Sequence, residues 1–180
     1  MSEYRTQKEL KPKVGEVAKE LLGEDKFENI LDFLEFLKTN KLTPRWYTSD
    51  SWVVKYKNYK VCQIKLNWMP RPSDKENFWV ICCDHFTRQK WFSDYDKNIT
   101  DDRLKEFIWN NINPPHGCNR KEGRCKGWSN MKILDKNFKA ICGCFPLVVK
   151  NPSGKTLEYA KEYVLLIKNF IADLALTDQA

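Results

Sequence analysis

The spacing of apolar residues changes twice along this chain, and this change constrains the fold more than any other feature. Near the start, apolar side chains recur at the three- and four-residue intervals of one helix face, at Phe27, Ile30, Leu31, Leu34 and Leu37. From Trp46 to about Phe92 the interval becomes two, which is typical of β-strands. A helical stripe then returns at Leu157, Ala160, Val164, Ile167, Ile171 and Leu174.

Capping and stop signals bound two helices in addition to the terminal one. Asp25 and Glu28 have the spacing of a capping box, which predicts that the first amphipathic helix begins there and ends before Pro44. Acidic residues at 101–102 complement the dipole of a second helix, which ends before Pro114. These signals place helices on both sides of the alternating segment.

The alternating segment predicts an antiparallel meander. The stretches SWVVKYKN and VCQIKLNW alternate around a tight turn expected at Asn58-Tyr59. The stretch NFWVICCD is apolar on both sides, as expected of a central strand, and a short strand near residues 89–92 follows. The sequence therefore predicts an α+β fold, an antiparallel β-meander packed against N- and C-terminal helices, with an irregular cysteine-rich segment.

A length of 180 residues suits one compact domain. Residues 1–24 carry as many basic as acidic residues and one weak helix near 14–22, so we expect them to form a charged lead-in. A single α+β domain is expected over residues 25–180, with a cysteine-rich insertion at about 114–145.

The cellular setting is predicted from what the sequence lacks. No stretch is apolar enough to cross a membrane, and the first residues have no apolar core of a secretory signal. Seven cysteines without an export signal indicate reduced thiols and a cytoplasmic protein. Phosphate loops, glycine fingerprints and paired catalytic carboxylates are absent, so we lean towards a protein that is not an enzyme. Cys83 with His85 is the alternative, a thiol nucleophile and its base, although a core cysteine explains that position more simply.

The stretch from His116 to Cys144 contains four of the seven cysteines and one of the two histidines. Metal knuckles place ligands two to four residues apart, whereas Cys118 and Cys125 are separated by six residues and Cys142 and Cys144 by one. The expected tetrahedral set for a structural zinc ion is Cys118, Cys125 and Cys142, with His116 or Cys144 as fourth ligand. Inert buried thiols and a redox or disulfide role remain open alternatives.

Aromatic and basic residues supply the remaining functional candidates. Trp46, Trp52, Tyr56 and Trp79 are expected to line a cleft for a small anionic or aromatic molecule, or else to fill the core. Lysines at 55, 57 and 60 alternate with tyrosines, which suits nucleic acid but is also usual on a solvated strand. Residues 111–150 carry eight Lys/Arg against two acids. We therefore predict a non-catalytic small-molecule-binding domain, with a nucleic-acid-associated protein using segment 111–150 as the alternative.

Three stretches together resemble a known group of proteins: DFLEFLKTNKLTPRW with SWVVKYKNYKVCQIKLN, then RLKEFIWNNINP, then ILDKNFKAICGC. They are similar to small uncharacterised bacterial α+β proteins, broadly YdhG-like, some of which have a cysteine-rich loop before the last helix. The resemblance covers roughly residues 27–175. It implies the same α+β fold and places Cys118, Cys125 and Cys142 in that loop, and it implies no activity.

Overall fold

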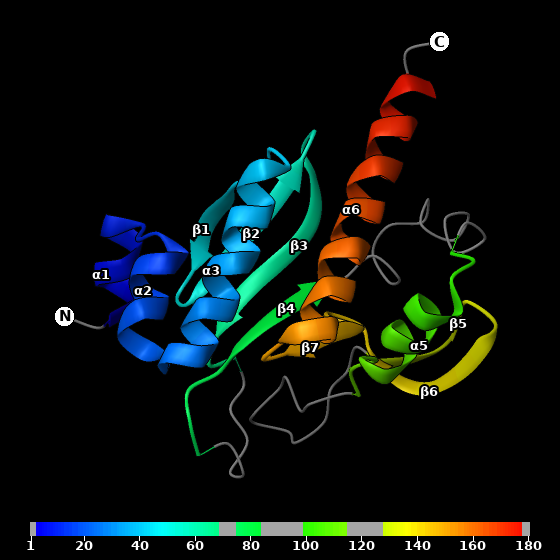
Figure 1. Cartoon of the computed structure of the whole chain (residues 1–180), viewed down its shortest axis with the longest axis horizontal. Coiled ribbons are helices and arrows are strands. Elements are labelled where there is room, and N and C mark those ends of the chain that lie inside the picture. The colour runs from blue at the N-terminus through cyan, green and yellow to red at the C-terminus, as the bar shows by residue number, and fades with distance from the viewer. Residues whose placement is uncertain (1–2, 69–74, 84–98, 115–127, 178–180) are drawn as a thin grey trace. The chain divides into compact units, whose positions relative to one another are not determined.

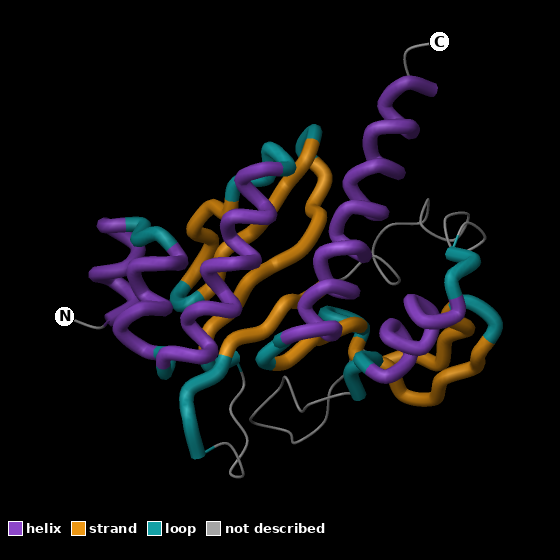
Figure 2. The backbone as a smooth tube through the Cα atoms, viewed as in Figure 1, coloured by secondary structure: helices purple, strands orange, loops and turns teal. Residues whose placement is uncertain are grey.

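A computed structural model describes residues 3–68, 75–83, 99–114 and 128–177 of the chain (Figures 1 and 2). The helices within these ranges are α1 (Glu3–Leu10), α2 (Val14–Leu21), α3 (Glu24–Thr39), α5 (Asp102–Asn110) and α6 (Gly154–Thr177). The strands are β1 (Pro44–Thr48), β2 (Ser51–Tyr56), β3 (Tyr59–Leu66), β4 (Trp79–Cys83), β5 (Trp128–Ile133), β6 (Lys136–Cys142) and β7 (Leu147–Lys150). The strand expected near residues 89–92 lies outside the described ranges.

The strands form a five-stranded antiparallel sheet in the order β1-β2-β3-β4-β7 and a separate β5–β6 hairpin. Helices from both ends of the chain pack against the sheet, so the predicted α+β fold is confirmed. None of the helices in the described ranges combines the length and apolarity needed to cross a bilayer.

The chain divides into two compact units, one made of residues 1–81 and 149–180 and the other of residues 82–148. The first unit contains the N-terminal helices as well as most of the sheet. The expected division between a lead-in over residues 1–24 and a domain over residues 25–180 stays a prediction.

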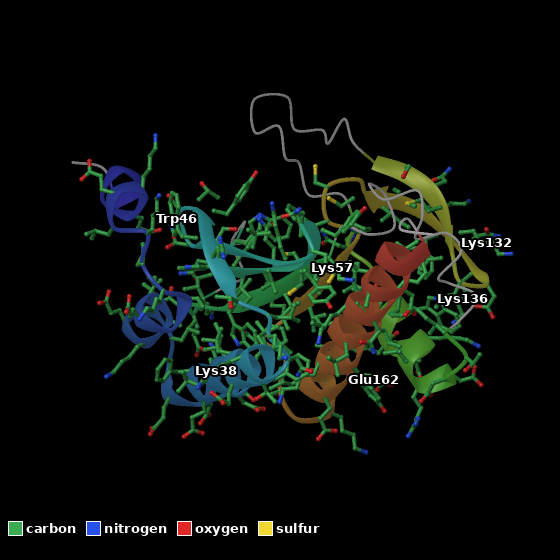
Figure 3. The ribbon with its side chains drawn as sticks, turned by 90° about the horizontal axis from the view of Figure 1, so that it is seen from above. Lys38, Trp46, Lys57, Lys132, Lys136 and Glu162 are labelled. Carbon is green, nitrogen blue, oxygen red and sulfur yellow. The ribbon has the colours of Figure 1, made fainter. Side chains whose placement is uncertain are left out.

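The core of the first unit lies between the sheet and two helices. In the register of β2 with β3, Trp52 faces Ile64 and Val54 faces Cys62, so these buried side chains share one sheet face. Helices α3 and α6 lie side by side against this sheet (Figure 3), and Lys161 of α6 donates to Asp32 of α3 at 2.6 Å. The apolar residues that α3 buries are Ile30, Phe33 and Leu37. The helical stripe predicted for α3 is confirmed only in part, because Ile30 and Leu37 are buried but Leu31 is 42% exposed and the buried Phe33 was not in the stripe.

Helix α3 begins and ends differently from the prediction. Its N-cap is Gly23, without a side-chain cap, and Asp25 lies in the first turn, so the predicted capping box is wrong. At the other end the Lys41 N–H donates to the Lys38 carbonyl at 3.0 Å, and the Leu42 N–H donates to the Leu37 carbonyl at 2.8 Å. This is a Schellman motif, in which Lys41 takes the left-handed position with φ 58°.

The turn between β2 and β3 also differs by one residue from the prediction. Lys57 and Asn58 have φ of 44° and 68°, the pair of positive values that a type I′ turn requires. Tyr59 is not in the turn but begins β3, opposite Tyr56. The turn was predicted at Asn58-Tyr59 because Asn tolerates a left-handed backbone, and the prediction missed that Lys57 adopts one too.

The second unit contains α5 and the β5–β6 hairpin. Asp101 caps α5 by accepting the Arg103 backbone N–H at 2.8 Å, which confirms the predicted start of this helix. The hairpin was not predicted. It is joined to α5 by Trp109, whose Nε1 donates to the Ile133 carbonyl at 3.2 Å and whose ring lies 3.5 Å from Lys136 Nζ.

Candidate functional site: a basic pocket on strands β1 and β2

A pocket of about 500 Å³ lies in the first unit, where the end of α3, the first two strands and the β2–β3 turn meet. Pockets for small ligands usually measure ~300–1,000 Å³, so this volume is in the useful range. We call it the basic pocket, and its lining residues are Lys41, Thr43, Arg45, Trp46, Val53, Lys55 and Asn58.

The register of β1 with β2 brings the strand cations together. Arg45 lies opposite Val53, which places Arg45 and Lys55 diagonally across the two strands on the same face. Successive side chains alternate, so this face is the reverse of the one on which Trp52 and Val54 are buried. Lys41 joins from the Schellman motif that ends α3, and Asn58 joins from the type I′ turn.

The charge of this region is strongly one-sided. Lys41, Arg45 and Lys55 line the pocket, and no carboxylate is among its described lining residues. Residues 41–68 contain six Lys/Arg but only one acid, Asp50. Lys60 lies directly opposite Lys55 on the neighbouring strand. Like charges opposite one another destabilise a sheet, so a bound anion would relieve this repulsion.

The one acid of this region is already engaged elsewhere. Asp50 accepts a hydrogen bond from Gln7 Nε2 at 2.7 Å, and its backbone N–H donates to Gln7 Oε1 at 3.0 Å. Trp46 Nε1 also points to Gln7 Oε1, at 3.5 Å. Helix α1 is therefore tied through Gln7 to the β1–β2 turn and to the tryptophan of the pocket wall, which Figure 3 labels beside β1.

The structure separates the four aromatic residues predicted to contact a ligand. Trp46 is half-buried and lines the basic pocket. Trp52 is 1% exposed and donates through Nε1 to the Pro12 carbonyl at 2.7 Å, and Trp79 is fully buried with its ring 5.9 Å from that of Phe33. Tyr56 is half-buried at the end of β2. The ligand-binding role of the four together stays a prediction.

Most of the predicted zinc ligands cannot be placed. His116, Cys118 and Cys125 lie outside the described residues, as does His85 of the alternative thiol site. Cys142 is buried in β6 and Cys144 is half-buried just after it, and both are free thiols. Among the residues the structure does describe, no three His, Cys, Asp or Glu side chains gather closely enough to hold a metal ion. The zinc site stays a prediction.

A second pocket, of about 680 Å³, lies at the start of α3 and carries both signs of charge. Lys26 Nζ donates to Glu76 Oε2 at 2.6 Å, and this hydrogen bond lowers the pKa of the Glu76 carboxyl. The other charged residues that line this pocket are Glu24, Asp25 and Lys75. Mixed charges favour no single class of ligand, so the basic pocket is the stronger candidate site.

Sequence reasoning missed Lys41, Thr43 and Arg45. The signal that could have found them is the run of six cations against one acid over residues 41–68. The pocket cations of that run lie on different elements, and only the strand register and the two turns bring them to one pocket.

No protein-family model matches this chain, and neither the curated proteins nor the solved structures contain a significant match. The YdhG-like resemblance stays a prediction.

Proposed function

We propose that this protein is a non-catalytic binding domain for a small anionic molecule, which it holds in the basic pocket. The observation that carries the proposal is the convergence of Lys41, Arg45 and Lys55 on one concave site without a carboxylate among the described lining residues. Cations held together in this way repel one another, and a bound anion turns that repulsion into attraction.

The hydrogen-bonding groups of the basic pocket also suit an anion. The guanidinium of Arg45 and the ammonium groups of Lys41 and Lys55 only donate. Thr43 adds a hydroxyl and Asn58 an amide, each of which donates as well. A site so rich in donors complements a ligand group that mainly accepts.

The described lining residues offer cations and hydrogen-bond donors rather than the His, Asp or Glu side chains that most often act as general acids and bases. Val53, on the same sheet face as Arg45 and Lys55, supplies apolar surface beside the cations, where the uncharged part of a ligand would pack.

Calorimetric titration of the full chain with benzoate and with phenol, its neutral counterpart of similar size, tests the proposal. Benzoate is expected to bind and phenol is not. Arg45→Gln and Lys55→Gln should each weaken benzoate binding, whereas the control Lys155→Gln, which removes an exposed charge from α6, should not. Equal binding of phenol and benzoate, or an equal loss in the Lys155 control, would contradict it.

Segment 111–150 supports a second proposal, an association with nucleic acid. Its described β5–β6 hairpin exposes Lys132, Lys136 and Lys139 against a single acid, Asp135. Phosphate contacts release counterions, so affinity for DNA or RNA should fall steeply with salt. Absence of binding at ~50 mM salt would remove this second function.

A further inference from the structure

We infer that the anion held in the basic pocket is the dianionic phosphate of a small phosphate monoester. This inference rests on the proposed function and makes it more specific. It starts from the charge of the site, which exceeds what a single carboxylate needs. Lys41, Arg45 and Lys55 supply three positive charges. A carboxylate neutralises one of them, whereas a phosphate monoester carries close to two negative charges at pH 7.

The surroundings of the basic pocket reinforce this excess of charge. Lys60 lies directly opposite Lys55 in the register of β2 with β3. The only acid in residues 41–68 is Asp50, which Gln7 already holds by two hydrogen bonds. A second negative charge on the ligand therefore meets attraction from every charged side chain described along the pocket.

The arrangement of donors suits three oxygens better than two. Arg45 offers a planar fork that can bind two phosphate oxygens at once. Lys41 follows the end of α3 and Lys55 lies on β2, so the two lysines join the lining from different elements. A planar carboxylate engaged by the fork has few positions left for two lysines, whereas a tetrahedral phosphate has a third oxygen for them.

The size of the pocket identifies the phosphate as part of a larger molecule. A volume of about 500 Å³ is much more than an inorganic phosphate ion fills. Val53, on the same sheet face as Arg45 and Lys55, adds apolar surface to the lining, which fits an organic group attached through one ester bond. A phosphodiester of a polynucleotide carries only one negative charge per phosphate and makes poorer use of the three cations.

Phenyl phosphate and phenyl sulfate form a matched pair for the test, because both are tetrahedral esters but the sulfate carries one charge at every pH. In a site open to water, a cation about 6 Å from the ligand raises the binding constant about threefold for each negative charge that the ligand carries. With three such cations, phenyl phosphate should bind about tenfold more tightly than phenyl sulfate, or more tightly still, at pH 7.5 and low salt.

The pH dependence follows from the ligand, because a phosphate monoester gains its second charge near pH 6. The described charged groups facing the ligand are Lys41, Arg45 and Lys55, with Lys60 opposite Lys55, and none is a histidine or a carboxylate. Phenyl phosphate should therefore lose its advantage at pH 5, where both esters are monoanions. Affinity for phenyl sulfate should be the same at both pH values.

Calorimetric titration of the full chain with both esters, at pH 5 and pH 7.5, decides between the outcomes. Arg45→Gln should weaken phenyl sulfate about threefold and phenyl phosphate about tenfold, since the Coulomb energy doubles with the ligand charge. Equal affinities of the two esters at pH 7.5 would overturn the inference while leaving an anion-binding pocket. Binding of neither ester would overturn the pocket as well. Tighter binding of an oligothymidylate that lacks terminal phosphates would show that the partner is a polynucleotide instead.

Discussion

The substitution Lys41→Gly should raise the stability of the chain and weaken its binding of the ligand. Lys41 occupies the left-handed position of the Schellman motif with φ 58°, where glycine is usual. A left-handed backbone destabilises the folded state by ~1–2 kcal/mol for a residue other than glycine. Glycine removes this strain, but it also raises the conformational entropy of the unfolded chain, which offsets ~0.4–1 kcal/mol of the gain. The free energy of unfolding should therefore rise by roughly 0.5–1 kcal/mol. For a chain of this length, that is about 1–4 °C in Tm.

Binding should change in the opposite direction. Lys41→Gly removes one of the three cations of the basic pocket, so affinity for phenyl phosphate should fall by about tenfold at low salt. Lys57→Gly is the matched control, since Lys57 also has a positive φ, 44°, carries the same charge and is not among the described lining residues. It should gain similar stability and keep most of the affinity.

Thermal unfolding followed by circular dichroism and calorimetric titration measure the two effects. A Lys41→Gly variant that melts below the wild type would refute the reasoning on backbone strain. If it instead binds phenyl phosphate as tightly as the wild type, or no more weakly than the Lys57→Gly control, Lys41 takes no part in the site.

Three further predictions concern the core, one helix cap and the cysteine-rich segment. Trp52→Phe should destabilise the chain by ~1–2 kcal/mol more than Trp79→Phe, because it leaves the Pro12 carbonyl without its donor, whereas the buried Trp79 Nε1 has no hydrogen-bond partner among the described residues. Equal losses of stability in urea unfolding would contradict this. Hydrogen bonds from Arg103 lower the pKa of Asp101 from 3.8 to about 2. The ionised Asp101 carboxylate therefore stabilises the folded state fully above pH 3.8, and this stabilisation is lost as the pH falls through about 2. Asp101→Asn should accordingly unfold more easily than the wild type at pH 5 but not below pH 2, and a constant difference over that range would oppose the assignment. If the cysteine-rich segment binds zinc, metal analysis should find one zinc ion per chain. Seven titratable thiols and no bound metal would contradict the zinc site and indicate inert cysteines.

Elements with a sustained apolar period were the predictable part of the fold. In α6 the predicted helical stripe is buried from Leu157 to Ile171, whereas in α3 Ile30 and Leu37 are buried but Leu31 is exposed. In β2 and β3 the sequence alternation does not separate a covered face from an open one, because residues 51–54 and 61–66 are all buried. The β5–β6 hairpin was missed because its register shifts between Ser129 and Met131 and because few of its residues are buried. A short hairpin of this kind depends on packing that a single sequence does not display.

The basic pocket was beyond prediction for a related reason. Arg45 and Lys55 become neighbours only through the register of β1 with β2, and Lys41 joins them only because the helix ends in a left-handed residue. Composition indicated the excess of cations, but it did not indicate that they would meet. The tryptophans divided in a similar way, since Trp52 fills the interior whereas Trp46 lines the pocket.

Mapping of backbone amide chemical shifts by NMR during titration with phenyl phosphate tests the central claim most directly. The largest changes should fall at residues 41–46 and 53–58, which contain every described residue of the basic pocket, and Arg45→Gln should reduce them together. Changes that gather instead at the start of α3 or on the β5–β6 hairpin, or a spectrum that does not respond, would contradict the account.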